Sequence, residues 1–157
     1  MAIWSAMATD LYEALRESHA RQRLLCRRLL RTTPGNARRD AFKELRVELA
    51  AHAAAEERYL YVAMLMHDAG LSSSRHALHE HHEIDELIED LQAPKRAGAG
   101  WMAKARALSK KVHHHLKEEE RKFFQVSGKM LTQKQKKELG AQYVADYERM
   151  RSRLQES

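Results

Sequence analysis

Two short segments of the chain each place a histidine and a glutamate four residues apart: His52 with Glu56, and His115 with Glu119. Residues at this spacing lie about one turn apart on the same face of a helix, where an imidazole and a carboxylate can share a metal ion. In both segments (HAAAEERYLY and HLKEEERKFF) a second glutamate and apolar or aromatic residues follow the pair. The two histidines stand 63 residues apart, at positions 52 and 115, which indicates a repeated unit.

Helical phase adds two more inward-facing histidines. At about 100° per residue, His81 falls on the apolar face that carries Ile84 and Ile88, and His19 follows Leu15 on the apolar face of its own segment. Both of these segments therefore contribute one histidine to the interior. The predicted inward-facing set is His19, His52, Glu56, His81, His115 and Glu119.

This combination of residue types predicts a metal site. A single histidine on an apolar stripe is usually a hydrogen-bonded core residue, but four of them with two buried carboxylates are hard to satisfy without a cation. Six nitrogen and oxygen ligands suit iron, manganese or zinc. Because a closed structural zinc site needs four ligands, six ligands suggest two ions. Glu56 and Glu119 can each bridge them, and the coordination positions left over would admit a small molecule.

The rest of the chain supplies the helices that must hold these side chains. Two prolines, six glycines and abundant Ala, Leu, Glu, Lys and Arg favour an all-α protein. Capping-box patterns, Asp10 with Glu13 and Thr132 with Gln135, mark two helix starts. A break at residues 32–36 ends the first helix, which runs from about residue 9 to 31.

The second helix extends to about His67, with Gly70 as a C-terminal stop. Residues 72–74 offer serine N-caps for the third helix, and 94–100 form a loop before the fourth. Short connections predict an up-down-up-down four-helix bundle. We expect a single domain over 1–157, in which residues 9–126 form the bundle and 132–155 form an accessory helix, packed on its outside or against a partner.

Composition and local sequence patterns indicate which cellular compartment and which partners to expect. The net charge of +6 comes from scattered basic residues with no recognisable nucleic-acid motif, so a nucleic-acid partner is not expected. No apolar stretch approaches the roughly 18 residues needed to span a membrane. The N-terminal residues lack the pattern of a secretory signal, and Cys26, as the one cysteine, suits a reducing compartment. We expect a cytoplasmic protein.

The ordered pattern of a single-histidine helix, HxxxEE, a single-histidine helix and HxxxEE again resembles the hemerythrin family, specifically its HHE cation-binding branch. Residues 81–83 read His-His-Glu, and the resemblance covers about residues 10–126. It implies a non-haem centre of two iron ions (Fe2+/Fe3+) with a bridging oxo or hydroxo group. The implied small-molecule ligand is dioxygen, peroxide or nitric oxide.

The chain departs from the oxygen-carrying members at two positions. Ala77 stands where those members have a second histidine, and they use the carboxylate that corresponds to Glu120, whereas Glu119 here preserves the symmetry with Glu56. The pattern resembles the branch with four His and two Glu, which favours catalase-like peroxide decomposition or an oxygen- or redox-responsive protein over oxygen carriage. The alternative is an iron- or oxygen-sensing module that signals to a partner protein without turnover.

Some neighbouring residues have two interpretations. Asp85, one turn after His81, either orients that imidazole or lies on the surface. Tyr59 either hydrogen-bonds a bridging ligand or fills the core. Cys26 is expected to be core. Residues 64–66 (Met-Leu-Met) form either a homodimer contact or the end of the bundle core.

Overall fold

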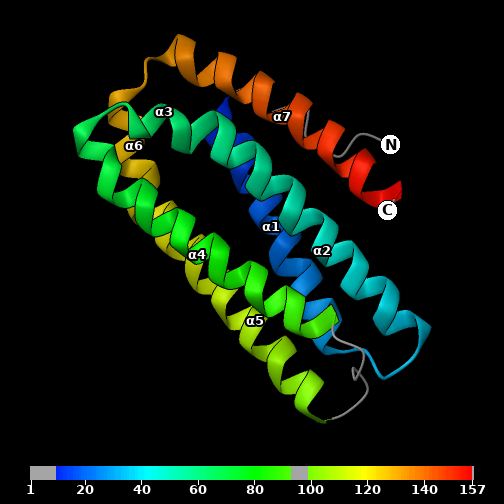
Figure 1. Cartoon of the computed structure of the whole chain (residues 1–157). Helices are drawn as coiled ribbons and strands as arrows, with labels where there is room; N and C mark the ends of the chain where they lie inside the picture. Colours follow the sequence, from blue (N-terminus) through cyan, green and yellow to red (C-terminus); the bar gives the residue numbers. More distant parts are fainter. Residues whose placement is uncertain (1–9, 93–98, 157) are drawn as a thin grey trace.

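The computed structural model describes residues 10–92 and 99–156, and the regular structure among them is entirely helical (Figure 1). The helices are α1 (Leu11–Leu30), α2 (Asn36–Glu56), α3 (Val62–Leu65), α4 (Asp68–Gln92), α5 (Ala99–Glu118), α6 (Phe124–Met130) and α7 (Gln133–Glu156). Two π-helical turns, η1 (Glu57–Tyr61) and η2 (Glu119–Phe123), continue α2 into α3 and α5 into α6. The predicted all-α bundle with an additional C-terminal helix is confirmed.

The helices pack as two hairpins. Helix α1 packs against α2, and α4 packs against α5, while contacts between α1 and α5 join the two hairpins. Helix α7 lies along α2 and also contacts α1 (Figure 1). The C-terminal helix therefore covers one side of its own bundle.

Helix ends follow the predicted capping signals. The Asp10 side chain accepts a hydrogen bond of 3.0 Å from the Glu13 amide at the start of α1. At the start of α7, Thr132 and Gln135 exchange two backbone-to-side-chain hydrogen bonds of 2.8 and 3.1 Å. Both interactions satisfy amides that have no partner within the helix. Gly35, at a φ of +138°, turns the chain between α1 and α2, a conformation open mainly to glycine.

The predicted start of the third helix was wrong. Helix α4 begins at Asp68, so Gly70 and residues 72–74 lie inside it and do not act as a stop and N-caps. A Cβ atom at Gly70 would lie 2.8 Å from the carbonyl oxygen of Met64, so the glycine permits a close approach between α3 and α4. Most of the predicted 94–100 loop lies outside the described residues, as does residue 9 at the predicted start of the first helix.

The π-helical turns change which side chains face inward after each of them. A π-helical turn holds more residues than an α-helical one and so rotates the chain that follows it. Tyr61 is therefore fully buried where the α-helical phase favoured Tyr59, which is only partly buried. Beyond η2, Ser127 is buried and Val126 is exposed, although an uninterrupted α-helical phase from His115 and Glu119 would place Val126 inside.

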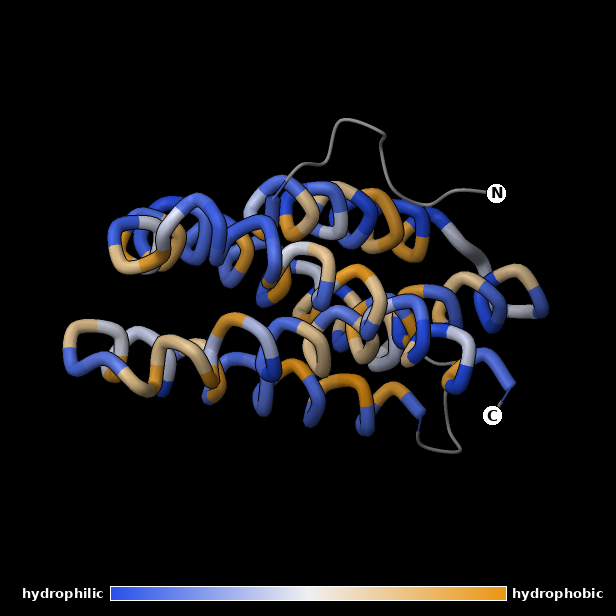
Figure 2. The backbone as a smooth tube through the Cα atoms, turned by 90° about the horizontal axis from the view of Figure 1, so that it is seen from above, coloured by the Kyte–Doolittle hydropathy of each residue, from blue (hydrophilic) through white to orange (hydrophobic). Residues whose placement is uncertain are grey.

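Two hydrophobic clusters form the core, one on each side of the predicted metal-site residues. In α1, Leu15 belongs to one cluster and Leu25 to the other, with His19 between them. In α4, Ala77 and Ile84 flank His81 in the same way. Hydrophobic and hydrophilic stretches alternate along the helices (Figure 2). The histidines thus form a polar layer between two apolar layers.

The core position predicted for Cys26 is confirmed, and residues 64–66 differ in their exposure. Cys26 is buried in the core, where burial raises the pKa of its thiol to about 12. Met64 is buried, but Leu65 and Met66 are exposed, so a homodimer contact there stays a prediction. Within the described part of the chain, no helix combines the length and the apolar character that crossing a membrane requires.

The contact between α7 and α1 yields the first testable prediction. A Cβ at Gly140 would lie 2.6 Å from the Leu11 amide nitrogen and 2.8 Å from the Asp10 carbonyl carbon, both backbone atoms. Gly140→Ala should lower the free energy of unfolding by about 1–3 kcal/mol, because the two helices must move apart. Urea denaturation measures this change.

Gly128→Ala is the matched control. Gly128 also lies in a helix, but a Cβ there would meet only the ring of Tyr12, at 4.0 Å. This variant should be unchanged or stabilised by about 0.5–1 kcal/mol, because alanine loses less backbone entropy in a helix. Equal effects at the two glycines would refute the close approach of α7 to α1.

Candidate metal centre

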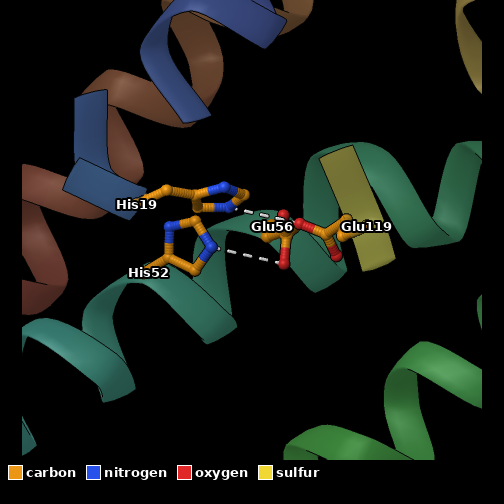
Figure 3. A group of neighbouring side chains, drawn as sticks. All are labelled: His19, His52, Glu56 and Glu119. Atoms are coloured by element: carbon orange, nitrogen blue, oxygen red, sulfur yellow. Dashed lines mark ion pairs between the residues drawn. The ribbon is translucent and has the colours of Figure 1, made fainter. Parts of the chain in front are cut away.

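The six predicted residues come together in one buried pocket. They form two groups of possible metal ligands, and within each group the ligand atoms lie within 4.8 Å of one another. The first group is His19, His52, Glu56 and Glu119 (Figure 3), and the second is Glu56, His81, His115 and Glu119. None of the six residues is more than 5% exposed.

The two groups share both carboxylates and follow the repeat in the sequence. The hairpin of α1 and α2 supplies both histidines of the first group, and the hairpin of α4 and α5 supplies both histidines of the second. Glu56 ends α2 immediately before η1, and Glu119 is the first residue of η2. Two carboxylates therefore lie between two histidine pairs, as expected from the repeat.

Each imidazole contacts a polar side chain through Nδ1, the ring nitrogen that faces away from the pocket. The contacts are His19 with Glu120 (2.8 Å), His52 with Tyr143 (2.7 Å), His81 with Glu57 (3.1 Å) and His115 with Glu80 (3.0 Å). A carboxylate at Nδ1 accepts its hydrogen, which leaves the Nε2 lone pair available. Such contacts fix ring orientation and raise the basicity of a metal-binding histidine. In all four rings, the other nitrogen is directed into the pocket.

These supporting residues were largely missed by the sequence analysis. Glu57, and not Asp85, contacts His81, and Asp85 is exposed. Glu120 is not part of either ligand group, because its carboxylate contacts His19 Nδ1 and the Arg23 guanidinium. Burial would raise the pKa of Glu120, but His19 and Arg23 lower it to about 2. The residue that aligns with the oxygen carriers' carboxylate therefore supports a histidine here.

Tyr61 enters the pocket because of η1. Its hydroxyl lies 2.7 Å from Glu56 Oε1, contacts Glu119 Oε2, and lies 3.4 Å from His81 Nε2. The expectation that a tyrosine near Glu56 reaches the pocket holds for Tyr61, five residues further on, in place of Tyr59. The equivalent residue after Glu119 is Phe124, which stacks on the His19 ring at 5.7 Å between centroids. Of the two equivalent residues, Tyr61 brings a hydroxyl to the carboxylates, whereas Phe124 brings an apolar ring to His19.

Buried polar atoms in the first group lack hydrogen-bond partners. Each of its four residues contributes one such atom: His19 Nε2, His52 Nε2, Glu56 Oε2 and Glu119 Oε1. Leaving a buried polar atom unpaired costs about 1–3 kcal/mol, more for a charged group. Of these atoms, His19 Nε2 and Glu119 Oε1 form an ion pair at 3.2 Å but no hydrogen bond. Four such atoms within one group of side chains fit a cation, which takes nitrogen and oxygen lone pairs together. The residues present therefore fit a metal ion.

The electrostatics of the pocket also favour added positive charge. Burial would lower the pKa of His19, but its ion pairs with Glu119 and Glu120 raise it to about 9. The pKa of His81 is raised to about 10 against burial, chiefly by Glu56 and Glu57. Without another cation the carboxylates hold protons on the imidazoles of His19 and His81, and metal ions would replace those protons.

A hollow at the surface borders the pocket. It has a volume of about 200 Å³, and its lining includes His115, Glu119, Phe123 and Ala77. Ala77, the position at which the resemblance implies a second histidine in the oxygen-carrying members, contributes only a methyl group to this wall. A larger hollow of about 390 Å³, beside Glu48 and Tyr147, includes none of the six residues in its lining.

Comparison with known proteins agrees with this geometry. A family model described as "Hemerythrin HHE cation binding domain" matches residues 10–126. Among solved structures, a hemerythrin HHE cation-binding domain-containing protein from Mycobacterium kansasii aligns with a TM-score of 0.82 at 24% sequence identity. The alignment covers 91% of this chain and 88% of that chain. A comparison with curated proteins found no significant match.

The contact between α7 and the pocket yields the second testable prediction. Tyr143→Phe should lower the free energy of unfolding of the metal-free protein by about 1–3 kcal/mol, because it leaves the Nδ1 atom of buried His52 without its partner. Urea denaturation monitored by circular dichroism measures the change. Tyr12→Phe is the control, since its partner Ser127 keeps a 2.8 Å bond to the Phe123 carbonyl. Equal losses in the two variants would contradict a specific role for Tyr143.

Proposed function

The chain belongs to the hemerythrin HHE cation-binding domain family, and from this premise we propose that its pocket holds two iron ions that react with dioxygen or peroxide. One observation carries the proposal. Two histidine pairs from opposite hairpins face the same two carboxylates, within 4.8 Å in each group. This arrangement supports two neighbouring ions better than one, because each carboxylate has an oxygen for either side.

The donor set supports iron. His19 and His52 would bind one ion and His81 and His115 the other, with Glu56 and Glu119 between them. Imidazole and carboxylate ligands without thiolate suit iron or manganese, and Cys26 lies in the core outside the pocket. Bound iron would supply a redox-active centre that can exchange electrons with dioxygen or peroxide.

The chain's own residues prepare the pocket for such chemistry. The four Nδ1 contacts hold the imidazoles in place, and the apolar layers on both sides keep bulk water out. The Tyr61 hydroxyl, which contacts Glu56 and Glu119, can donate a hydrogen bond toward the second group. The hollow of about 200 Å³ next to His115 and Glu119 has room for a ligand of two oxygen atoms. Peroxide decomposition is therefore the reaction that we propose first.

A second candidate function is favoured by one contact. Tyr143 of α7 bonds directly to His52, so a shift of that imidazole on metal binding would act on α7. Arg58 of η1 also pairs with Asp146 of α7 at 3.0 Å. Helix α7 could thereby report iron or oxygen occupancy to a partner protein without turnover.

Oxygen evolution tests the first candidate. Iron-loaded wild-type protein should contain two irons per chain and convert two molecules of hydrogen peroxide into two waters and one dioxygen. His115→Ala should lose iron and this activity, and its Tm should fall by about 5–10 °C. This range follows because a ligand at a hundred times its Kd adds about 2.7 kcal/mol of stability, and each kcal/mol is worth about 2–4 °C at this chain length.

His79→Ala serves as the control, because it removes a histidine whose side chain is exposed on α4. It should keep both irons and the activity. If His115→Ala also kept both irons and evolved oxygen, the assignment of the pocket would be wrong. Wild-type protein with two irons and no oxygen evolution, but with iron-dependent binding to a partner, would favour the sensing module.

A further inference from the structure

A third group of possible metal ligands lies at the mouth of the hollow. It consists of His76 and Glu80, one turn apart on α4, and Glu118, the last residue of α5. Their ligand atoms all lie within 4.8 Å of one another. His76 Nε2 lies 3.1 Å from Glu118 Oε1 and 3.4 Å from Glu80 Oε1. An imidazole and two carboxylates thus converge from two helices.

The three side chains differ in solvent exposure, from His76 at the surface to Glu80 in the interior. The side chain of His76 is 54% exposed, that of Glu118 is 24% exposed and that of Glu80 is 4% exposed. All three line the hollow of about 200 Å³ whose inner wall includes His115 and Glu119. An ion held by them would be in contact with water on one side and would face the pocket on the other.

Glu80 contacts residues of both the buried pocket and the group at the hollow. Its Oε1 atom, which faces His76, also accepts the 3.0 Å hydrogen bond from His115 Nδ1. One carboxylate oxygen can accept a hydrogen bond and still offer a lone pair to a cation. The Nζ atom of Lys111 lies 3.6 Å from the other oxygen of Glu80 and 2.8 Å from Glu83, so Lys111 leaves the Oε1 side to His76.

Ordinary surface ion pairs do not share these features. His79 with Glu83 and His82 with Glu86 are also four residues apart on α4, but their side chains are well exposed and each pair lies on a single helix. Such pairs contribute little to stability. The group at the hollow differs because one of its carboxylates is buried, a third donor comes from another helix, and the space beside it leads to the pocket.

We propose that His76, Glu80 and Glu118 form a third divalent-cation site, at which an ion such as Fe2+ is held before it enters the buried pocket. Nitrogen and oxygen donors of this kind suit Fe2+, Mn2+ and Zn2+. Three protein ligands leave the remaining positions to water, so the ion binds more weakly than in the pocket and can be passed inward. The loading role rests on the proposed function of the pocket, whereas the binding of a cation at the mouth does not.

Titration of the metal-free full-length protein with Co2+ tests this site. The experiment compares the wild type, the double variant His76→Ala/Glu118→Ala and the matched control His82→Ala/Glu86→Ala. The control removes the same two residue types from an exposed pair on α4. Equilibrium dialysis gives the number of ions bound, and visible absorption after rapid mixing gives the loading rate of the buried ions.

Wild type and control should bind three Co2+ ions per chain, and the double variant should bind two. The double variant should also load its buried ions about tenfold more slowly, because a charged cleft raises the local cation concentration and the on-rate. Circular dichroism should show that all three proteins fold alike, since the substituted side chains reach solvent.

Two results would overturn the inference: an unchanged number of bound ions in the double variant, or an unchanged loading rate. Failure of the proposed pocket would look different. In that case the wild type would bind one ion, and the double variant would bind none.

Discussion

Two carboxylates, Glu56 and Glu119, lie inside a hydrophobic bundle, and their charge must be balanced there. An isolated buried carboxylate is too costly to persist, so it must be paired, protonated or bound to a cation. Four imidazoles surround these carboxylates, and a polar side chain contacts the Nδ1 atom of each imidazole. The two apolar clusters on either side strengthen this requirement, because electrostatic interactions are stronger where water is excluded. Most features of the pocket follow from these two charges.

The π-helical turns give the two halves of the pocket different properties. Each turn follows or begins at one of the carboxylates, and each brings an aromatic residue into the layer five positions later. In the first repeat this residue is Tyr61, whose hydroxyl contacts both carboxylates, and in the second it is Phe124, which covers His19. The half with the hydroxyl also faces the hollow beside Ala77. A symmetric set of ligands therefore has the Tyr61 hydroxyl and the hollow beside its second group and the Phe124 ring beside His19 of its first group.

The sequence was sufficient to predict the inward-facing residues, because helical phase and the 63-residue repeat depend on local spacing alone. The same reasoning found the capped starts of α1 and α7. It could not find Tyr61, because an α-helical phase does not anticipate a π-helical turn. It also missed Glu80 and Tyr143, which reach His115 and His52 from other helices through contacts that no spacing rule encodes. The start of α4 was misplaced because serines resemble N-caps wherever they precede an apolar stripe.

The central claim is that both carboxylates lie between two ions, each held by one pair of histidines. Crystals of the iron-loaded protein, measured at the iron absorption edge, test this claim most directly through anomalous scattering. Two peaks are expected, one beside the Nε2 atoms of His19 and His52 and one beside those of His81 and His115, with the carboxylates of Glu56 and Glu119 between them. A single peak, or iron bound elsewhere with the pocket unchanged, would contradict it.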